Sequence, residues 1–161
     1  MRSLNPGRAR RGFSLIELVI VVVIIGIIGA IAIPRMSRGA AGAADSALKA
    51  NLSVLRNAID LYAAEHGGTF PKADTIEAQL TQYSNAAGAT QATKDTATGF
   101  IYGPYLRSIP PLPVNCPRKG ATGVAAADNT GIGWIYNENT GEIHANTTTE
   151  KDDNGVLYSA Y

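Results

Sequence analysis

The sequence has few of the residues that build catalytic and metal sites. Its 161 residues include one cysteine, Cys116, and two histidines. A single cysteine excludes a disulfide within this chain, and the lack of a Cys/His cluster argues against a structural zinc site. The motifs of serine hydrolases, phosphate-binding loops, dinucleotide folds and zinc proteases do not occur. No pair of carboxylates stands out as an acid–base couple, so the sequence favours a role other than catalysis.

A strong positive charge is also missing. The formal net charge is +1, and four arginines lie within the first twelve residues. Without those twelve residues the chain has 10 basic against 13 acidic residues, a net charge of −3. A mildly acidic chain is not expected to have nucleic acid as its main partner.

One long apolar run, residues 13–33, dominates the N-terminal part, and it carries a carboxylate, Glu17, near its start. As a helix the run is about 30 Å long, the thickness of a bilayer core, and we predict a transmembrane helix here. A charge inside such a segment costs roughly 2.5–3.5 kcal/mol, which makes Glu17 a candidate functional residue. The arginines before the run outnumber Arg35 and Arg38 after it, so the N-terminus is expected in the cytoplasm.

Two common kinds of segment share this general pattern. One is a plain signal anchor in which Glu17 is incidental. The other is a secretory signal peptide, with a basic start, an apolar centre and Ala30-x-Ala32 as the cleavage site.

The residues at the start of the run favour a third interpretation. Gly12-Phe13-Ser14-Leu15-Ile16-Glu17, after a short basic leader, resembles the cleavage and methylation site of type IV pilins and type II secretion pseudopilins. Pro34 matches a proline that the family has about one span later. The resemblance covers about the first third of the chain.

The resemblance implies a role for each matching position. Prepilin peptidase would cut after Gly12 on the cytoplasmic side, Phe13 would become the N-methylated mature N-terminus, and Glu17 would act in assembly. A free α-amine is mostly cationic at neutral pH, so Glu17 of an incoming subunit can pair with the Phe13 amine of a docked one. Pro34 is expected to kink the helix, because it removes a backbone hydrogen bond.

The implied organisation has three parts: a leader at 1–12, a transmembrane and assembly helix at 13–33, and a periplasmic or extracellular part at 34–161. The last part continues the helix and adds a soluble head. Within the family, the chain resembles the major pseudopilin most. One reason is the sequence Gly103-Pro104-Tyr105-Leu106 before a proline run, and the other is the absence of the C-terminal disulfide that many type IV pilins have. The chain would then be a single-pass inner-membrane protein that builds a filament and helps to export folded proteins. The implied partners are lipid, further copies, prepilin peptidase, minor pseudopilins and an inner-membrane assembly platform.

Two other functions stay open. The first is the major pilin of a type IV pilus, for adhesion, motility or DNA uptake. The second, of another class, is a membrane-tethered binding module that keeps its leader and stays monomeric.

Beyond the run, a second apolar pattern predicts an amphipathic helix. Leu48, Leu52, Leu55, Ile59, Tyr62 and His66 follow at alternating spacings of four and three. We favour a helix lying against a sheet over a coiled-coil seam, with its end at Gly67-Gly68. His66 is interpreted as a wet helix-end residue rather than a ligand.

The remaining chain predicts an α+β, pilin-like head with a small antiparallel sheet. Asp74 is expected to cap a short helix that ends near Ser84-Asn85, and residues 85–99 form a surface loop. The proline-rich stretch 100–117 is extended chain that seals the core, rather than a Pro-x-x-Pro ligand. Residues 131–146 form a hairpin that turns at Asn139-Thr140-Gly141, with Trp134 packed on the Leu52–Ile59 helix face.

The acidic stretch Asp152-Asp153-Asn154-Gly155 raises the question of calcium. Major pseudopilins bind calcium near their C-terminal strands, and carboxylate oxygens suit that ion. The spacing is not that of an EF-hand, however, and a solvated acidic turn is the simpler interpretation. We therefore expect no cofactor, with calcium as the alternative.

Overall fold

The computed structural model describes residues 13–152 and 154–161, and it describes the side chains of these residues except 31–41. The chain divides into two compact units, Met1–Gly39 and Ala40–Tyr161. The second unit is called the head below. Helix α1 (Leu15–Glu65) contributes residues to both units.

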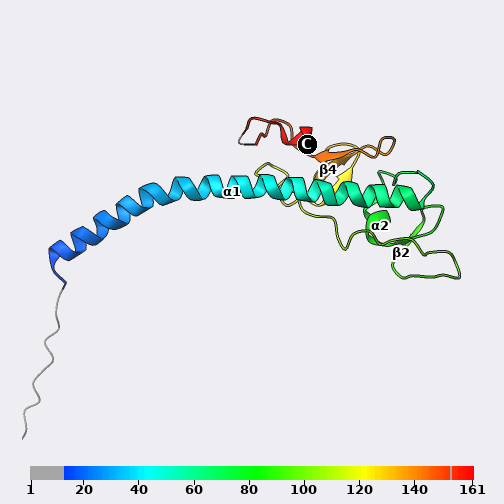
Figure 1. Ribbon diagram of the computed structural model, residues 1–161, viewed down its shortest axis with the longest axis horizontal. Coiled ribbons are helices and arrows are strands. Elements are labelled where there is room, and N and C mark those ends of the chain that lie inside the picture. Colours follow the sequence, from blue (N-terminus) through cyan, green and yellow to red (C-terminus); the bar gives the residue numbers. More distant parts are fainter. Residues whose placement is uncertain (1–12, 153) are drawn as a thin grey trace, which may run out of the picture. The chain divides into compact units, whose positions relative to one another are not determined.

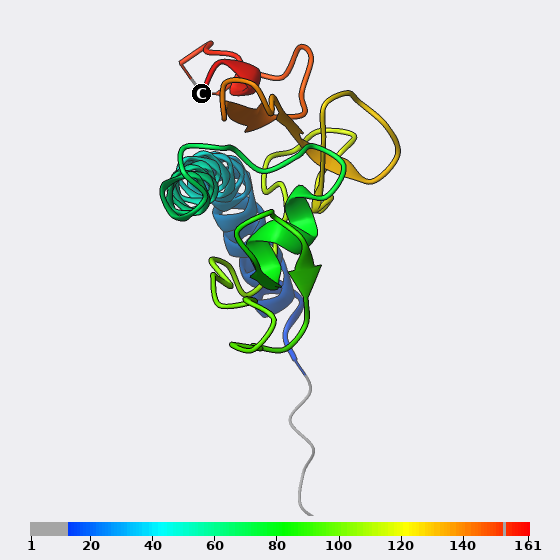
Figure 2. The same ribbon diagram turned by 90° about the vertical axis from the view of Figure 1, so that its right-hand side faces the viewer.

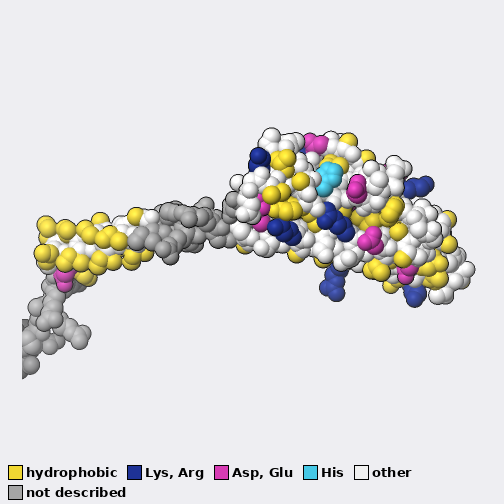
Figure 3. Space-filling view, turned by 45° about the horizontal axis from the view of Figure 1, so that its top comes forward, with side chains coloured by type: hydrophobic (Ala, Val, Ile, Leu, Met, Phe, Trp, Pro, Cys, Tyr) yellow, Lys and Arg dark blue, Asp and Glu magenta, His cyan; other side chains and the backbone are white. Residues whose placement is uncertain are grey.

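The described part of the first unit is a helix covered with apolar side chains. The large apolar residues from Phe13 to Ile28 are 51–86% exposed, and Figure 3 shows hydrophobic side chains covering this segment. Among the described residues, no helix combines the length and hydropathy of a membrane span. Pro34, where the sequence predicts a kink, lies in 31–41, whose side chains are outside the described part.

In the head, α1 supplies one wall of the core, as the stripe predicted. Leu48, Leu52, Leu55, Ile59 and Tyr62 are at most 3% exposed. The helix ends at Glu65, and the N–H of Gly68 bonds back to the Ala63 carbonyl at 2.7 Å. Gly67 and Gly68 both have positive φ, which glycine adopts without strain, so the predicted end is confirmed.

The predicted hairpin is also confirmed. Strands β4 (Ile132–Tyr136) and β5 (Ile143–Ala145) are antiparallel, and Trp134 lies opposite Ala145. The side chains of Trp134, Tyr136, Ile143 and Ala145 are buried in the same hydrophobic cluster as the α1 stripe. Figures 1 and 2 show β4 beside the head portion of α1. The fold of the head is therefore α+β.

The sequence predicted an antiparallel sheet. A third strand makes the sheet mixed instead. Strand β3 (Gly123–Ala125) pairs with β4 in parallel, with an irregular register after Gly123. Three residues are too few for an alternating pattern, so this strand depends on tertiary contacts. The chain approaches β4 closely here, because a Cβ at Gly133 would lie 2.3 Å from the Ala121 carbonyl oxygen.

Helix α2 (Ile76–Thr81) is shorter than predicted and is capped differently. The cap position is Thr75 rather than Asp74, and it makes no side-chain capping bond. Glu77 accepts the Val124 N–H at 2.9 Å and thus covers the outer edge of β3. The helix stops before Ser84, because the Ser84 backbone pairs with Tyr102.

The predicted loop at 85–99 contains a short strand, β2 (Thr90–Gln91), which is antiparallel to β1 (Tyr83–Ser84). The proline-rich stretch seals the core, as predicted: Ile109, Leu112 and Val114 are buried. The Trp134 indole N–H donates to the Pro110 carbonyl at 2.9 Å, which fixes this stretch against β4. The last element is a short 3-10 helix, η1 (Tyr158–Ala160).

Candidate assembly site at the start of α1

The carboxylate of Glu17 is bound to the start of its own helix. Glu17 Oε2 accepts the Ser14 backbone N–H at 2.8 Å, and the Ser14 carbonyl accepts the N–H of Leu18 at 3.3 Å. Because α1 begins at Leu15, Ser14 is the N-cap and Glu17 is the third helical residue, as in half of a capping box. The negative charge is also favoured by the helix dipole.

This local bond leaves the carboxylate able to accept another donor. An ionised carboxylate has two oxygens and about four lone-pair sites. Ser14 is the donor recorded for it among the described residues, and the Glu17 side chain is exposed. A cationic group from another molecule can therefore reach Glu17 without displacing the helix cap.

The structure places two of the four predicted site residues near each other. Phe13 is 86% exposed and directly precedes the N-cap Ser14, four residues before Glu17 in the sequence. Gly12 lies outside the described residues, as does the side chain of Pro34. The residue that sequence reasoning missed is Ser14, although its signal, Ser-x-x-Glu before an apolar run, is present.

The surroundings of this carboxylate suit binding rather than catalysis. Residues 18–33 contain no charged or nucleophilic side chain. General acid–base or nucleophilic chemistry needs a second group within hydrogen-bond reach. A lone exposed carboxylate on an apolar helix can instead select a cationic partner and set its position along the helix.

His66 is not the wet helix-end residue that the sequence predicted. Its ring is half-buried and stacks on Tyr62 with centroids 3.8 Å apart. Nδ1 lies 2.8 Å from the Tyr62 carbonyl oxygen and Nε2 lies 3.0 Å from that of Asn85. His66 thus joins the end of α1 to the turn after β1, and its nitrogens face carbonyl oxygens rather than a ligand site.

Asp152 is a buried turn residue rather than a solvated one. Its Oδ1 accepts the N–H groups of Asn154 and Val156 at 2.9 and 2.8 Å, and its Oδ2 accepts the Asn154 amide and the Tyr161 hydroxyl. The Tyr161 hydrogen bond, followed by these others, lowers the pKa of Asp152 to about 2. Asp153 lies outside the described residues.

These contacts test whether the C-terminal region fits calcium. Calcium takes six to eight oxygen ligands, several of them carboxylates. Both oxygens of Asp152 already accept donors from the chain. Among the described residues, no three Asp, Glu, His or Cys side chains are grouped closely enough to hold a metal. The described residues around Asp152 therefore do not fit this ion.

Comparison with known proteins identifies the start of the chain. Residues 7–33 match the prokaryotic N-terminal methylation motif, which is characteristic of type IV pilins and pseudopilins. The matched segment includes both Phe13 and Glu17, and it points to a structural subunit rather than an enzyme. No curated protein and no solved structure matches the chain.

Proposed function

From the prokaryotic N-terminal methylation motif in residues 7–33, we propose that this chain is a subunit of a pilin-like filament. Prepilin peptidase removes residues 1–12, and Phe13 becomes the methylated N-terminus. The observation that carries the proposal is the coincidence of this motif with an exposed carboxylate, Glu17, on an otherwise apolar helix surface.

Removal of the leader creates the partner that Glu17 needs. Phe13 then ends in an α-amine, which is mostly cationic at neutral pH. Glu17 keeps the Ser14 N–H on one oxygen and receives the Phe13 amine of a neighbouring subunit on the other. Between packed apolar helices an unpaired charge is costly, so this pair sets the register of the subunits.

The exposed apolar surface of residues 13–28 supports a membrane origin for the subunits. We propose that residues 13–33 cross the inner membrane with the N-terminus in the cytoplasm and the head outside. Subunits then exchange lipid contacts for contacts with other subunits, with help from an inner-membrane assembly platform.

The head portion of α1 offers a second surface for self-assembly. Opposite the core stripe, a row of residues at spacings of four and three is exposed and uncharged. Its members are Ala50, Val54, Asn57, Leu61 and Ala64. Val54 and Leu61 are 47% and 56% exposed, which is high for side chains that gain free energy by burial.

The filament we favour is the pseudopilus of a type II secretion system, with this chain as its major pseudopilin and minor pseudopilins as partners. A C-terminal disulfide, which closes a loop in many type IV pilins, cannot form in a chain whose single cysteine is Cys116. Force on exported proteins would come from filament growth driven by a partner ATPase.

Mass spectrometry of the protein isolated from membranes tests the processing step. We expect a chain that begins at Phe13 and carries one N-terminal methyl group. A chain that retains residues 1–12 would contradict the proposal. Deletion of the gene then separates the two kinds of filament: lost secretion supports a pseudopilus, whereas lost surface fibres with intact secretion would show a pilus.

A further inference from the structure

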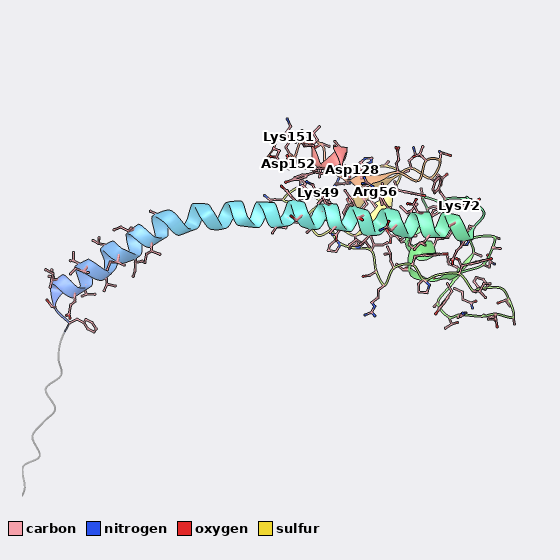
Figure 4. All side chains as sticks on the ribbon, viewed as in Figure 1. Lys49, Arg56, Lys72, Asp128, Lys151 and Asp152 are labelled. Carbon is pink, nitrogen blue, oxygen red and sulfur yellow. The ribbon has the colours of Figure 1, made fainter. Side chains whose placement is uncertain are left out.

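Three loops of the head meet at an arginine. Arg118 Nη2 lies 2.8 Å from both carboxylate oxygens of Asp128. Asp128 Oδ1 also accepts the Asn146 side-chain amide at 2.7 Å, and the same amide donates to the Ile132 carbonyl at 2.8 Å. Asn146 is 7% exposed. We call Arg118, Asp128 and residues 146–150 the loop cluster (Asp128 is labelled in Figure 4).

The carboxylates of this region accept hydrogen bonds from the chain itself, and Asp128 is paired with the Arg118 cation. Arg118, and after it Asn146, holds the pKa of Asp128 below its usual value. Glu150 Oε2 accepts the N–H groups of Thr148 and Thr149, both at 3.1 Å. Asp152, two residues further along the chain, accepts four hydrogen bonds. A calcium ion in the loop cluster would have to compete with the Arg118 cation for Asp128.

One buried polar atom of the loop cluster makes no hydrogen bond within the described part of the chain. The Thr147 hydroxyl oxygen is buried and has no partner among the described residues. It lies beside a cavity of about 210 Å³ that Arg118, Asp128 and Glu150 also line. The two carboxylates beside this oxygen are too few for an ion that takes six to eight oxygen ligands, and one of them, Asp128, is already paired with Arg118.

We infer that the guanidinium of Arg118 occupies the place of a structural cation in the loop cluster, and that the C-terminal part of the head is closed without calcium. This departs from what the resemblance to major pseudopilins implies. The inference concerns the head and holds whichever filament the chain builds, so its test is independent of filament assembly.

Thermal unfolding of the processed full chain in detergent tests metal independence. We expect the same Tm in EDTA and in millimolar calcium chloride, and no heat of binding when calcium is titrated in. A Tm that rises with calcium, or stoichiometric calcium binding, would overturn the inference.

A pair of variants tests the role of Arg118. Arg118→Met removes the charge and the donors but keeps the apolar stem, and we expect it to lower Tm by about 2–4 °C. Lys119→Met removes the same charge from an exposed neighbour and should leave Tm unchanged. Equal changes in Tm from the two substitutions would show that Arg118 does not take the place of a structural cation in the loop cluster.

Discussion

At the scale of single residues, Glu17 combines two functions that one substitution can separate. Its carboxylate caps α1 through the Ser14 N–H, and we propose that it also binds the α-amine of a second subunit. The cap needs an oxygen acceptor, which a glutamine also supplies. The intermolecular pair needs a negative charge, which a glutamine lacks.

Glu17→Gln should therefore keep the helix and abolish the pairing. We expect the variant to insert and to be processed normally, while the yield of sheared filaments falls at least tenfold. Glu17→Asp, which keeps the charge on a shorter stem, is the matched control and should assemble better. Filaments formed by Glu17→Gln at the normal yield would contradict the pairing.

Tyr161 shows how one hydroxyl sets the pH response of the C-terminal segment. Because Asp152 has a pKa of about 2 in the folded state, below its unfolded value of about 3.9, its stabilisation is complete above pH 4 and disappears as the pH falls towards 2. Tyr161→Phe removes the largest contributor to this shift. The variant should melt below the wild type at pH 7, and the two melting temperatures should converge near pH 2. A difference that is constant over this pH range, followed by circular dichroism, would assign the effect to packing.

At the scale of elements, much of the head could be predicted because its strongest patterns are long. The α1 stripe and the β4–β5 hairpin each repeat over enough residues to identify the element and its buried face. Strand β3 has three residues and is defined by β4 and by Glu77 from α2, contacts that the local sequence does not encode. The prediction of the α2 cap was wrong for the same reason, because the Glu77 carboxylate accepts the Val124 N–H instead of an N–H at the start of its own helix.

The start of α1 was predicted less completely than its sequence allowed. Glu17 was assigned to assembly from the family resemblance and from its charge in an apolar run. Its capping bond to Ser14 follows from the Ser-x-x-Glu spacing alone, which the sequence shows directly. For His66, the stripe placed it on the same helix face as Tyr62, but its contacts with Tyr102 and Asn85 form only in the folded head and could not be predicted.

The two faces of α1 in the head should respond oppositely to substitution. Leu55 is fully buried, so Leu55→Ala should destabilise the head by about 2–5 kcal/mol. Leu61 is 56% exposed, and Leu61→Ala should change the free energy of unfolding by less than about 0.5 kcal/mol. If the exposed row contacts other subunits, Leu61→Ala should nevertheless reduce filament yield. Chemical denaturation and filament shearing separate the two effects, and normal filaments from Leu61→Ala would exclude the row from the assembly contacts.

At the scale of the whole molecule, we propose that processing decides whether the chain can assemble. Before cleavage, the Phe13 nitrogen is a neutral amide and the arginine-rich leader remains attached. Cleavage after Gly12 would change the net charge from +1 to −3 and convert that amide into a cation. Gly12→Glu should block the cut, because a bulky charged residue replaces glycine at the scissile bond.

We therefore expect Gly12→Glu to accumulate in the membrane at the size of the precursor and to build no filaments, although its Glu17 and its head are unchanged. Immunoblots of membrane fractions give the size, and the Tm of the purified variant confirms that the head is folded. Gly7→Glu, which alters the leader away from the cut, is the control and should be processed. Filaments built from uncleaved Gly12→Glu would show that the free Phe13 amine is not required, and the apolar helix surface alone would then account for cohesion.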